Sequence, residues 1–337
     1  MTSAPVSVIV TVYNEIASID ALLATLASQS RAPDEVVIVD GGSDDGTLER
    51  LRATAAREGQ GPAWPAEIRL TVVSAPGANI SEGRNLAIRS AQGPWLAVTD
   101  AGVRLEPQWL ARLLAPIDAG ASWVAGFFAS DPTTCFETAL GAVTLPLASE
   151  IDPTRFLPSS RSVAFRRVDA LEIGGYPEWL DYCEDLIFDL RLIRAIGRPA
   201  FAPQAVAHFR PRTSLAAFGR QYFRYARGDG KADLFAGRHA LRYATYLVAI
   251  PLLLTTSLAA RAPWSWLAGW LLAAGLLAMQ WRPLRRLPLQ WTRLGPIERL
   301  KALALLPMLR IWGDLAKMLG YPVGRLWRRR NRPPAWR

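Results

Sequence analysis

The sequence predicts an α/β fold with a mostly parallel sheet and helices on both faces, followed by a C-terminal transmembrane helical hairpin. Residues 6–13 read V-S-V-I-V-T-V-Y and residues 36–40 read V-V-I-V-D, with the β-branched bias of strands buried on both faces. Between them, apolar residues recur at helical spacing from Ile19 to Leu26. Two long, almost uncharged runs at 241–260 and 264–281 predict the hairpin.

The first strand, helix and second strand are followed by G-G-S-D-D-G-T and a helix pattern from Leu48. Polar loops therefore follow the carboxyl ends of both strands, the edge at which open α/β sheets bind ligands. The alternative is that Asp40 and the glycines only build a tight turn. The loop lacks G-x-G-x-x-G and the P-loop lysine, which disfavours a dinucleotide site and a Walker-type phosphate site.

Charge divides the chain into two halves. Residues 1–203 carry 16 basic and 25 acidic side chains, a net of −9, whereas residues 204–337 carry 23 and 4, a net of +19. A basic half beside an acidic one suggests nucleic acid or a membrane surface. The apolar runs favour a membrane, and because no nucleic-acid motif accompanies the charge we expect no nucleic-acid partner.

Cysteine usage and the start of the chain indicate a cytosolic amino-terminal domain. Cys135 and Cys183 are too few and too far apart for a disulfide scaffold or a zinc site, and are expected to be reduced thiols. The first apolar run has no basic n-region, so we expect no signal peptide. Residues 57–67 are expected to form a loop between a helix and a strand.

A further buried strand, W-L-A-V-T-D at residues 95–100, ends on Asp100. A carboxylate at this edge, near the Asp40 loop, suits a divalent cation, because Mg²⁺ takes oxygen ligands and commonly shares them with substrate phosphates. The alternative is an aspartate that caps the next segment.

The opening V-S-V-I-V-T-V-Y-N-E, followed by V-V-I-V-D-G-G-S-D-D-G-T, resembles the signature of the family 2 glycosyltransferases. The resemblance implies a GT-A-type, Rossmann-like domain that binds a nucleotide-sugar donor, a UDP- or GDP-sugar. It places Thr11, Tyr13, Glu15 and Asp40 facing the nucleotide. The family often has a second aspartate where Gly41 stands here.

The same resemblance implies a divalent cation, Mg²⁺ or Mn²⁺, at the family's D-x-D motif. This chain reads D-A-G, so only Asp100 is retained and another group or water must replace the missing ligand. His208 is a candidate, since related enzymes often have a histidine at a comparable place. The alternative is a structural histidine.

Residues 82–85 read E-G-R-N, where the family commonly has A-R-N. The resemblance puts Arg84 and Asn85 near the nucleotide, and the guanidinium fork of Arg84 could bind a phosphate. The alternative is an ordinary exposed arginine near a helix start.

Adjacent acids at Glu184 and Asp185 open a helix pattern in which Asp185 and Asp189 share a face. The alternative is a pair of helix N-terminal acids that interact favourably with the helix dipole. The family has an x-E-D motif at this distance, and its final aspartate, here Asp185, is the catalytic base that deprotonates the acceptor hydroxyl. A single-displacement attack inverts the anomeric configuration.

Residues 220–228 read R-Q-Y-F-R-Y-A-R-G, so Gln221, Arg224 and Tyr225 resemble the Q-x-x-R-W motif of membrane-bound family members. Arg224 could stabilise the leaving diphosphate as negative charge develops on it. The alternative is a basic amphipathic helix on anionic lipid, and both could hold on different faces.

The runs at 241–260 and 264–281 cover about 30 and 27 Å as helices, roughly one hydrocarbon core each. Basic residues flank both, with six in 220–242 and five in 282–299. The positive-inside rule therefore predicts two cytosolic ends joined by an external turn. A buried soluble hairpin is the alternative. Residues 297–319 predict an interfacial amphipathic helix, and the basic tail a lipid-facing anchor or a disordered segment.

The sequence thus predicts an inverting glycosyltransferase that moves a sugar from a nucleotide-diphosphate sugar to a lipid or lipid-linked acceptor, at the cytosolic face of the inner membrane. The expected parts are a catalytic domain (1–205), a basic interfacial segment (206–240), a transmembrane hairpin (241–281) and a basic surface tail (282–337). One alternative is an inactive transferase-like scaffold, suggested by Gly41 and Gly102. A second is a polysaccharide synthase, although two spans are too few to enclose an export channel. A third is a nucleotidyltransferase.

Overall fold

The computed structural model describes residues 4–56 and 64–336, so residues 57–63 of the predicted 57–67 loop lie outside the described residues. The chain forms two compact units. The first, here called the sheet unit, comprises residues 1–131, 147–210 and 334–337. The second, the helical unit, comprises residues 132–146 and 211–333, and therefore takes a short segment from within the first half of the chain.

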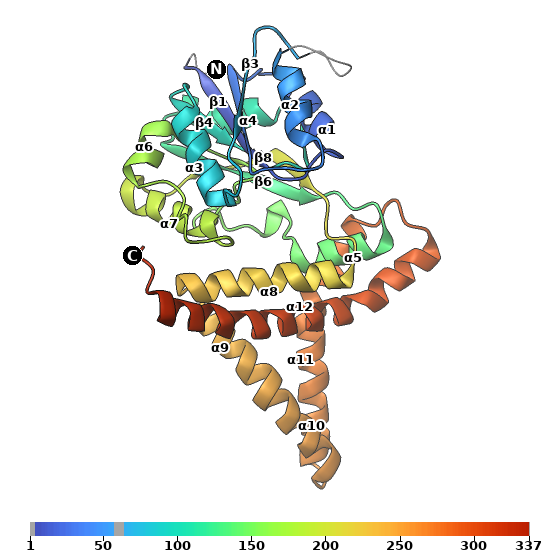
Figure 1. Ribbon diagram of the computed structural model, residues 1–337. Helices are drawn as coiled ribbons and strands as arrows, with labels where there is room; N and C mark the ends of the chain where they lie inside the picture. Colours follow the sequence, from blue (N-terminus) through green and yellow to red (C-terminus); the bar gives the residue numbers. More distant parts are fainter. Residues whose placement is uncertain (1–3, 57–63, 337) are drawn as a thin grey trace. The chain divides into compact units, whose positions relative to one another are not determined.

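In the described part of the sheet unit, eight strands form one sheet in the order β3-β2-β1-β4-β7-β6-β8-β5 (Figure 1). The strands are β1 (Val6–Val12), β2 (Glu35–Asp40), β3 (Arg69–Ser74), β4 (Trp95–Val98), β5 (Val103–Leu105), β6 (Trp123–Ser130), β7 (Val163–Arg166) and β8 (Ala200–Phe209).

The sheet is mixed, since four of the strand pairings in the described residues are parallel and three are antiparallel. Strand β1 runs parallel to β2 and β4, and β2 runs parallel to β3, as the β-α-β-α pattern predicts. Strand β7 then enters antiparallel to β4 and β6, and β5 pairs antiparallel with β8. Strands β6 and β8 are parallel. The expectation of a mostly parallel sheet was wrong for the second half, because the direction of a strand depends on distant pairing partners.

Helices cover both faces of the sheet, as predicted. Alternate residues of β1 face opposite cores: Val8 and Val10 pack with α1 and α4, whereas Ile9 packs with α3, α6 and α7. This alternation is the period-two geometry of a strand. The helices of this unit are α1 (Ile19–Ala27), α2 (Thr47–Ala56), α3 (Ile80–Ser90), α4 (Trp109–Asp118), the short 3₁₀ helix η1 (Ala148–Glu150), α6 (Arg167–Glu172) and α7 (Glu184–Ile196).

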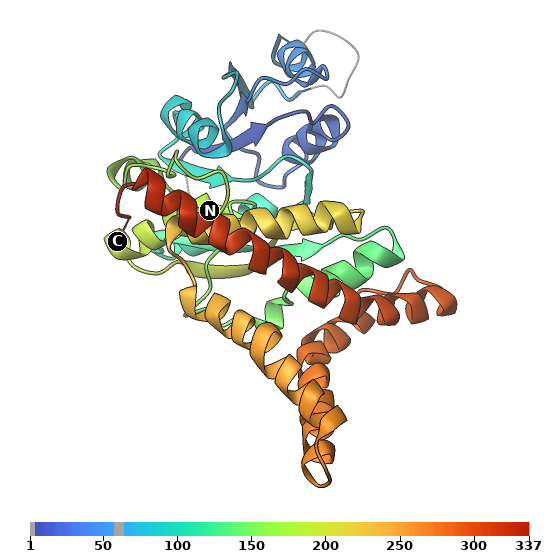
Figure 2. The ribbon, with the colours of Figure 1, turned by 60° about the horizontal axis from the view of Figure 1, so that its bottom comes forward.

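The helical unit is built around two helices that lie side by side, α8 and α12 (Figures 1 and 2). A Cβ on Gly320 would lie 2.1 Å from the carbonyl oxygen of Phe223, and one on Gly324 would lie 2.0 Å from that of Arg227. The two backbones therefore touch where glycine leaves room. The elements of this unit are α5 (Cys135–Thr144), α8 (Leu215–Ala232), α9 (Ala236–Ala244), the π-helical η2 (Thr245–Ala249), α10 (Ile250–Ala259), α11 (Trp264–Arg286), η3 (Leu287–Leu289) and α12 (Pro296–Asn331).

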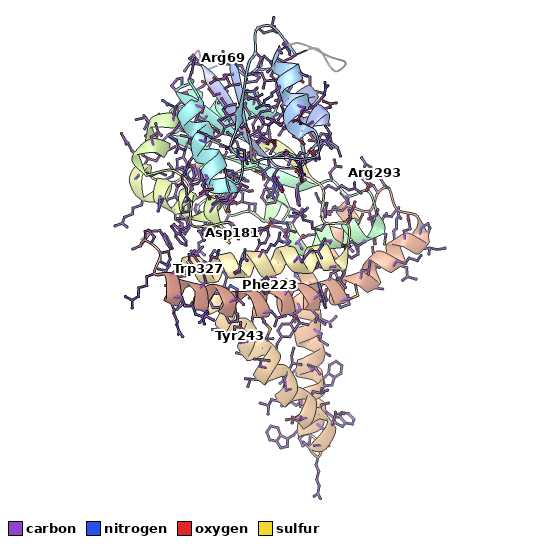
Figure 3. All side chains as sticks on the ribbon, viewed as in Figure 1. Arg69, Asp181, Phe223, Tyr243, Arg293 and Trp327 are labelled. Carbon is purple, nitrogen blue, oxygen red and sulfur yellow. The ribbon has the colours of Figure 1, made fainter. Side chains whose placement is uncertain are left out.

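A helical hairpin extends from this unit, formed by the continuous α9–η2–α10 segment and by α11 (Figure 3). Among the residues that the structure describes, one helix, Ala236–Ala259, is long and apolar enough to cross a membrane, and none of its most apolar window is buried. The exposure of that window runs against a buried soluble hairpin. The hairpin is present as predicted, but the pattern of a membrane span is found in its first helix and not in α11, which ends in basic residues.

Helix α12 is amphipathic, as predicted for 297–319, but continues to Asn331. Large apolar residues recur along one exposed stripe at spacings of three or four, apart from one longer step between Leu300 and Met308. They include Ile297, Leu300, Met308, Ile311, Leu315, Leu319, Val323 and Leu326.

Candidate active site

Two loops at the carboxyl edge of the sheet are tied together by Asn14, which adopts a left-handed backbone with φ 56°. Its side-chain amide donates to Asp44 Oδ1 at 2.9 Å, and the Asp44 N–H donates back to Asn14 Oδ1 at 3.0 Å. Asparagine tolerates this conformation better than most residues. The loop after β1 is therefore fixed to the loop after β2.

Asp40 closes the turn that follows β2. Its side chain is fully buried, and Oδ1 accepts from the N–H groups of Gly42 and Ser43, both at 2.9 Å. Oδ2 accepts from Ser43 Oγ at 2.6 Å. These contacts are the ones expected of an aspartate that builds a tight turn, and a contact with nucleotide stays a prediction.

Thr11, Tyr13 and Glu15 line this edge in different ways. The Thr11 methyl packs against α3, since a Cβ on Gly83 would lie 2.9 Å from it. Tyr13 is 62% exposed and its ring lies beside Gly41, so it is open to a ligand. Glu15 accepts a hydrogen bond from Ser18 Oγ, and its Oε2 lies 3.7 Å from the position of a Cβ on Gly102.

Arg84 lies between two predicted site residues that are far apart in sequence. Its Nη1 donates to Glu184 Oε1 at 2.7 Å, and its Nη2 donates to Asp100 Oδ1 at 2.8 Å. The guanidinium also lies 5.1 Å from the centre of the Tyr176 ring. Because Arg84 is 3% exposed, it is no ordinary surface arginine, and its hydrogen bonds join α3, the end of β4 and the start of α7.

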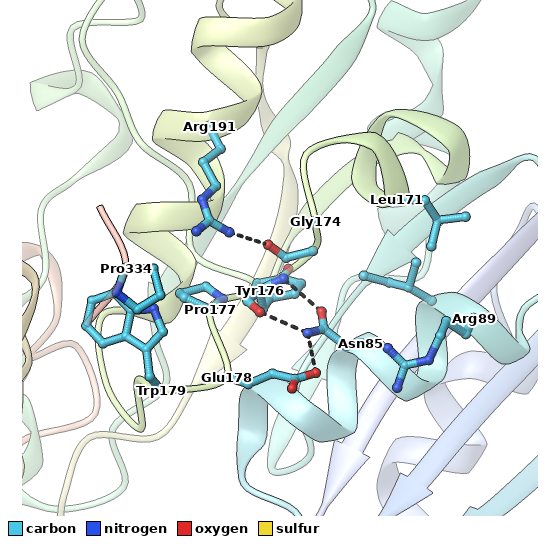
Figure 4. A pocket seen from close by; sticks show the side chains of 12 residues that line it. Asn85, Arg89, Leu171, Gly174, Tyr176, Pro177, Glu178, Trp179, Arg191 and Pro334 are labelled. Carbon is cyan, nitrogen blue, oxygen red and sulfur yellow. Dashed lines mark hydrogen bonds between the residues drawn. The ribbon is translucent and has the colours of Figure 1, made fainter. Parts of the chain in front are cut away.

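Asn85, the next residue on α3, holds a loop. Its amide donates to the Tyr176 carbonyl at 2.8 Å and to Glu178 Oε1 at 2.9 Å, and it accepts from the Tyr176 N–H at 2.7 Å. It lines a pocket of about 410 Å³ with Trp179 and Arg191 (Figure 4). Neither Asp100 nor Asp185 lines this pocket, and a contact between Asn85 and a nucleotide stays a prediction.

Asp100 also faces a second arginine that the sequence reasoning missed. Arg161 Nε lies 3.5 Å from Asp100 Oδ2. Arg161 lies in P-S-S-R-S-V, which carries no motif, and it reaches this edge because β7 begins two residues later. The pKa of Asp100 is lowered: burial raises it, but Arg84 and Arg161 outweigh burial, so the carboxylate is ionised.

Glu184 and Asp185 open α7 after Cys183, which has a left-handed backbone with φ 65°. Glu184 is buried against Arg84, whereas Asp185 is partly exposed and its Oδ1 accepts from the Leu186 N–H at 2.9 Å. Both acids lie in the first turn, where the helix dipole favours negative charge. Asp185 is therefore the more exposed member of the pair.

Proton affinity is raised along this face of α7. Burial, and then the charge of Asp185, raise the pKa of Glu184 to about 7, although Arg84 opposes the shift. Burial raises the pKa of Asp185, and burial together with Asp185 raises that of Asp189 well above its ordinary value. Raised carboxyl pKa values suit groups that take up a proton near neutral pH.

His208, the predicted metal ligand on β8, pairs its Nε2 with Glu106 Oε1. Within residues 4–56 and 64–336, no group of three or more His, Cys, Asp and Glu side chains could hold a metal ion. Asp100 and the Glu15 carboxylate beside Gly102 still offer oxygen ligands. Mg²⁺ commonly uses one or two carboxylates plus substrate phosphates, so these residues fit such a cation.

Gln221 and Arg224 lie on α8 of the helical unit. Gln221 Nε2 donates to the Tyr225 hydroxyl at 2.9 Å, which links two members of the Q-x-x-R-Y segment across one helical turn. The Arg224 side chain is exposed. Their roles toward a diphosphate stay predictions.

The sequence is similar to those of two known proteins. The chain is 35% identical over 111 residues to validoxylamine A glucosyltransferase of Streptomyces hygroscopicus subsp. limoneus, a match that covers 32% of this chain and only 23% of that protein. It is 27% identical over 244 residues to the succinoglycan biosynthesis protein ExoA of Rhizobium meliloti (strain 1021), covering 68% of this chain and 71% of that protein.

Among solved structures, the mannosyltransferase PcManGT of Pyrobaculum calidifontis, in complex with GDP-Man and Mn²⁺, superposes with a TM-score of 0.52 at 18% identity. The superposition covers 98% of this chain and 88% of that one, and it supports a GT-A-like fold. The family model described as Glycosyl transferase family 2 matches residues 7–157, which confirms the resemblance drawn from the opening motifs. The chain therefore carries a family 2 glycosyltransferase domain over residues 7–157.

Proposed function

We propose that this protein is an inverting glycosyltransferase that uses a nucleotide-diphosphate sugar and a lipid or lipid-linked acceptor. The proposal rests on the exposure of Asp185 and on the residues beside it. Asp185 is a partly exposed carboxylate next to Glu184, which Arg84 joins to Asp100 at the carboxyl edge of the sheet. A base with a raised pKa thus lies beside the edge at which α/β sheets bind nucleotides.

Asp185 takes the proton of the acceptor hydroxyl in the proposed reaction. The hydroxyl oxygen attacks the anomeric carbon, a new carbon–oxygen bond forms, and the bond from the anomeric carbon to the diphosphate breaks. The nucleoside diphosphate leaves with the bonding electron pair. One displacement on the face opposite the leaving group inverts the configuration, and general-base catalysis contributes about 10²- to 10⁴-fold.

The donor side of the site is formed by Tyr13, Glu15 and Asp100. The exposed Tyr13 ring is available to pack against the nucleotide. Asp100 and Glu15 are proposed to hold Mg²⁺ or Mn²⁺ against the diphosphate, where the cation would offset the negative charge of the leaving group.

Three features of the C-terminal part of the chain support a membrane acceptor. The helix Ala236–Ala259 has the length and composition of a span, residues 204–337 carry a net charge of +19, and α12 exposes an apolar stripe. Such a charge favours the anionic cytoplasmic leaflet, and an amphipathic helix lies in the interface. We therefore propose that the hairpin spans the inner membrane, that the catalytic domain is cytosolic, and that the product stays in the inner leaflet.

The test is to incubate the detergent-purified protein with a panel of labelled nucleotide sugars and extracted membrane lipids, with and without a chelator. The labelled product is then partitioned between organic solvent and water. We expect one donor to give chelator-sensitive label in the lipid phase. Label only in water-soluble oligosaccharide, unaffected by added lipid, would exclude a lipid acceptor, and absence of transfer from every donor would favour the inactive scaffold.

A further inference from the structure

Arg161 is positioned by the pairing of two antiparallel strands. Strand β4 pairs with β7 so that Val98 lies opposite Val163. In an antiparallel register, each step forward on one strand matches a step back on the other. The same register, continued two residues beyond the ends of the strands, sets Asp100 opposite Arg161, and their side chains form the 3.5 Å ion pair.

Two aromatic rings from other strands hold the Arg161 guanidinium. It lies 4.5 Å from the centre of the Phe209 ring at the end of β8, and 5.6 Å from that of Phe128 on β6. Its Nη1 donates to Ser159 Oγ at 3.0 Å. Aromatic faces attract a guanidinium and fix its orientation without cancelling its charge.

Arg84 and Arg161 flank Asp100 but differ in their distance from it and in their exposure. Arg84 is closely paired with two carboxylates, at 2.7 and 2.8 Å, and only 4% of its side chain is exposed. Arg161 meets Asp100 at a longer distance, and 19% of its side chain is exposed. Arg161 is therefore the more accessible of the two arginines to an incoming anion at this edge, whereas reaching Arg84 would break two close pairs.

We propose that Arg161 binds the diphosphate of the nucleotide-sugar donor and stabilises the leaving group. The inference rests on the proposed function and assigns the phosphate contact within the sheet unit to Arg161 rather than Arg84. As the bond between the anomeric carbon and the diphosphate oxygen breaks, the electron pair stays on that oxygen. The guanidinium donates hydrogen bonds to the diphosphate and offsets the growing charge, with no proton lost from Arg161.

The test measures ligand binding rather than transfer alone. The full-length protein and its Arg161→Met, Arg161→Lys and Arg166→Met variants are titrated calorimetrically with UDP and GDP, and with the matching nucleosides uridine and guanosine. Arg166→Met is the control because Arg166 ends strand β7, which begins just after Arg161, and because Arg166 pairs with Asp169 and is exposed. We expect Arg161→Met to weaken binding of the preferred nucleoside diphosphate about 10- to 100-fold and to leave nucleoside binding within about twofold.

The other variants separate charge from folding. Arg161→Lys should recover part of the loss, because it restores a charge without the planar fork, and Arg166→Met should match the parent. Equal losses for diphosphate and nucleoside in Arg161→Met, or no loss of diphosphate binding, would overturn the assignment while leaving the proposed function intact. If the parent bound neither UDP nor GDP, the proposed function itself would fail, and that outcome is visible without any variant.

Discussion

Arg84 Nη1 lies 2.7 Å from Glu184 Oε1, although 100 residues separate them in the chain. The same guanidinium reaches Asp100, so one buried cation joins α3, the end of β4 and the start of α7. Burial lowers the pKa of Arg84, but the charges of Asp100 and Glu184 outweigh burial and raise it. Arg84 is thus a permanently charged centre that fixes the acids around it.

Replacing Arg84 with methionine should destabilise the protein by about 3–5 kcal/mol, because it leaves buried carboxylates without their partner. Urea unfolding of the detergent-purified protein measures the change. Arg89→Met is the matched control, since Arg89 is exposed on the same helix and its replacement should cost less than about 0.5 kcal/mol. Equal stabilities of the two variants would show that the Arg84 pairs contribute little.

Asp185→Asn should lower the transfer rate about 10²- to 10⁴-fold and change nucleotide-sugar binding little, because it removes a proton acceptor while nearly conserving shape. Single-turnover rates and donor titrations measure both quantities. Asp189→Asn, one helical turn away, is the control. Burial and Asp185 raise the pKa of Asp189, which favours the protonated form that asparagine resembles. An Asp185→Asn rate within threefold of the parent would rule out the base.

Glu184 should make stability depend on pH. Its pKa in the folded protein is about 7, above the ordinary 4.5, so the folded state holds the proton more tightly than the unfolded state. The resulting stabilisation is complete below pH 4.5 and is lost as the pH rises through about 7. We expect the apparent Tm of the parent to fall more steeply over this range than that of Glu184→Gln. Parallel curves for the two proteins would contradict the raised pKa.

The first third of the chain could be predicted because each element carries its own periodicity. Strands β1 and β2 could be recognised from their β-branched runs and α1 from its helical spacing, without knowledge of any distant pairing partner. The motifs also found Arg84, Asp100 and Glu184, but not that one arginine joins the other two.

Arg161 could not be predicted, because its place depends on β7 running antiparallel to β4. Neither residue composition nor spacing encodes which distant strands pair, nor the register of Val98 opposite Val163. His208 illustrates the same limit. The sequence offered it as a metal ligand, and the structure pairs it with Glu106, 102 residues away, through the pairing of β5 with β8.

Gly324→Ala should destabilise the helical unit by about 1–3 kcal/mol, since the new methyl group would meet the backbone of α8. Its Cβ would lie 2.0 Å from the Arg227 carbonyl oxygen, which cannot move without shifting the helix. Gly275→Ala on α11 is the control, because its Cβ would meet nothing within 4 Å. The control should be neutral or slightly stabilising, as alanine favours helix over glycine. Thermal unfolding in detergent compares the two, and an unchanged Gly324→Ala would argue against tight α8–α12 packing.

The hairpin could cross the membrane or insert into one leaflet, and cysteine labelling distinguishes the two arrangements. Helix α11 has 23 residues, about 34 Å, and it ends in Arg285 and Arg286, so its length permits a span although its hydropathy is lower than that of Ala236–Ala259. A crossing places the turn at residues 260–263 outside the membrane, with both basic ends inside. We expect Ala262→Cys to react with a membrane-impermeant maleimide added to intact spheroplasts.

The control for that experiment is Gly237→Cys, at the basic end of the first hairpin helix, where a Cβ meets no atom within 4 Å. It should react only after the membrane is broken, and the parent, with Cys135 and Cys183, sets the background. If Ala262→Cys also reacts only in broken membranes, the hairpin inserts into the inner leaflet without crossing it. The apolar faces of α10 and α11 would then anchor the protein from the cytosolic side, and the predicted pair of spans would be wrong.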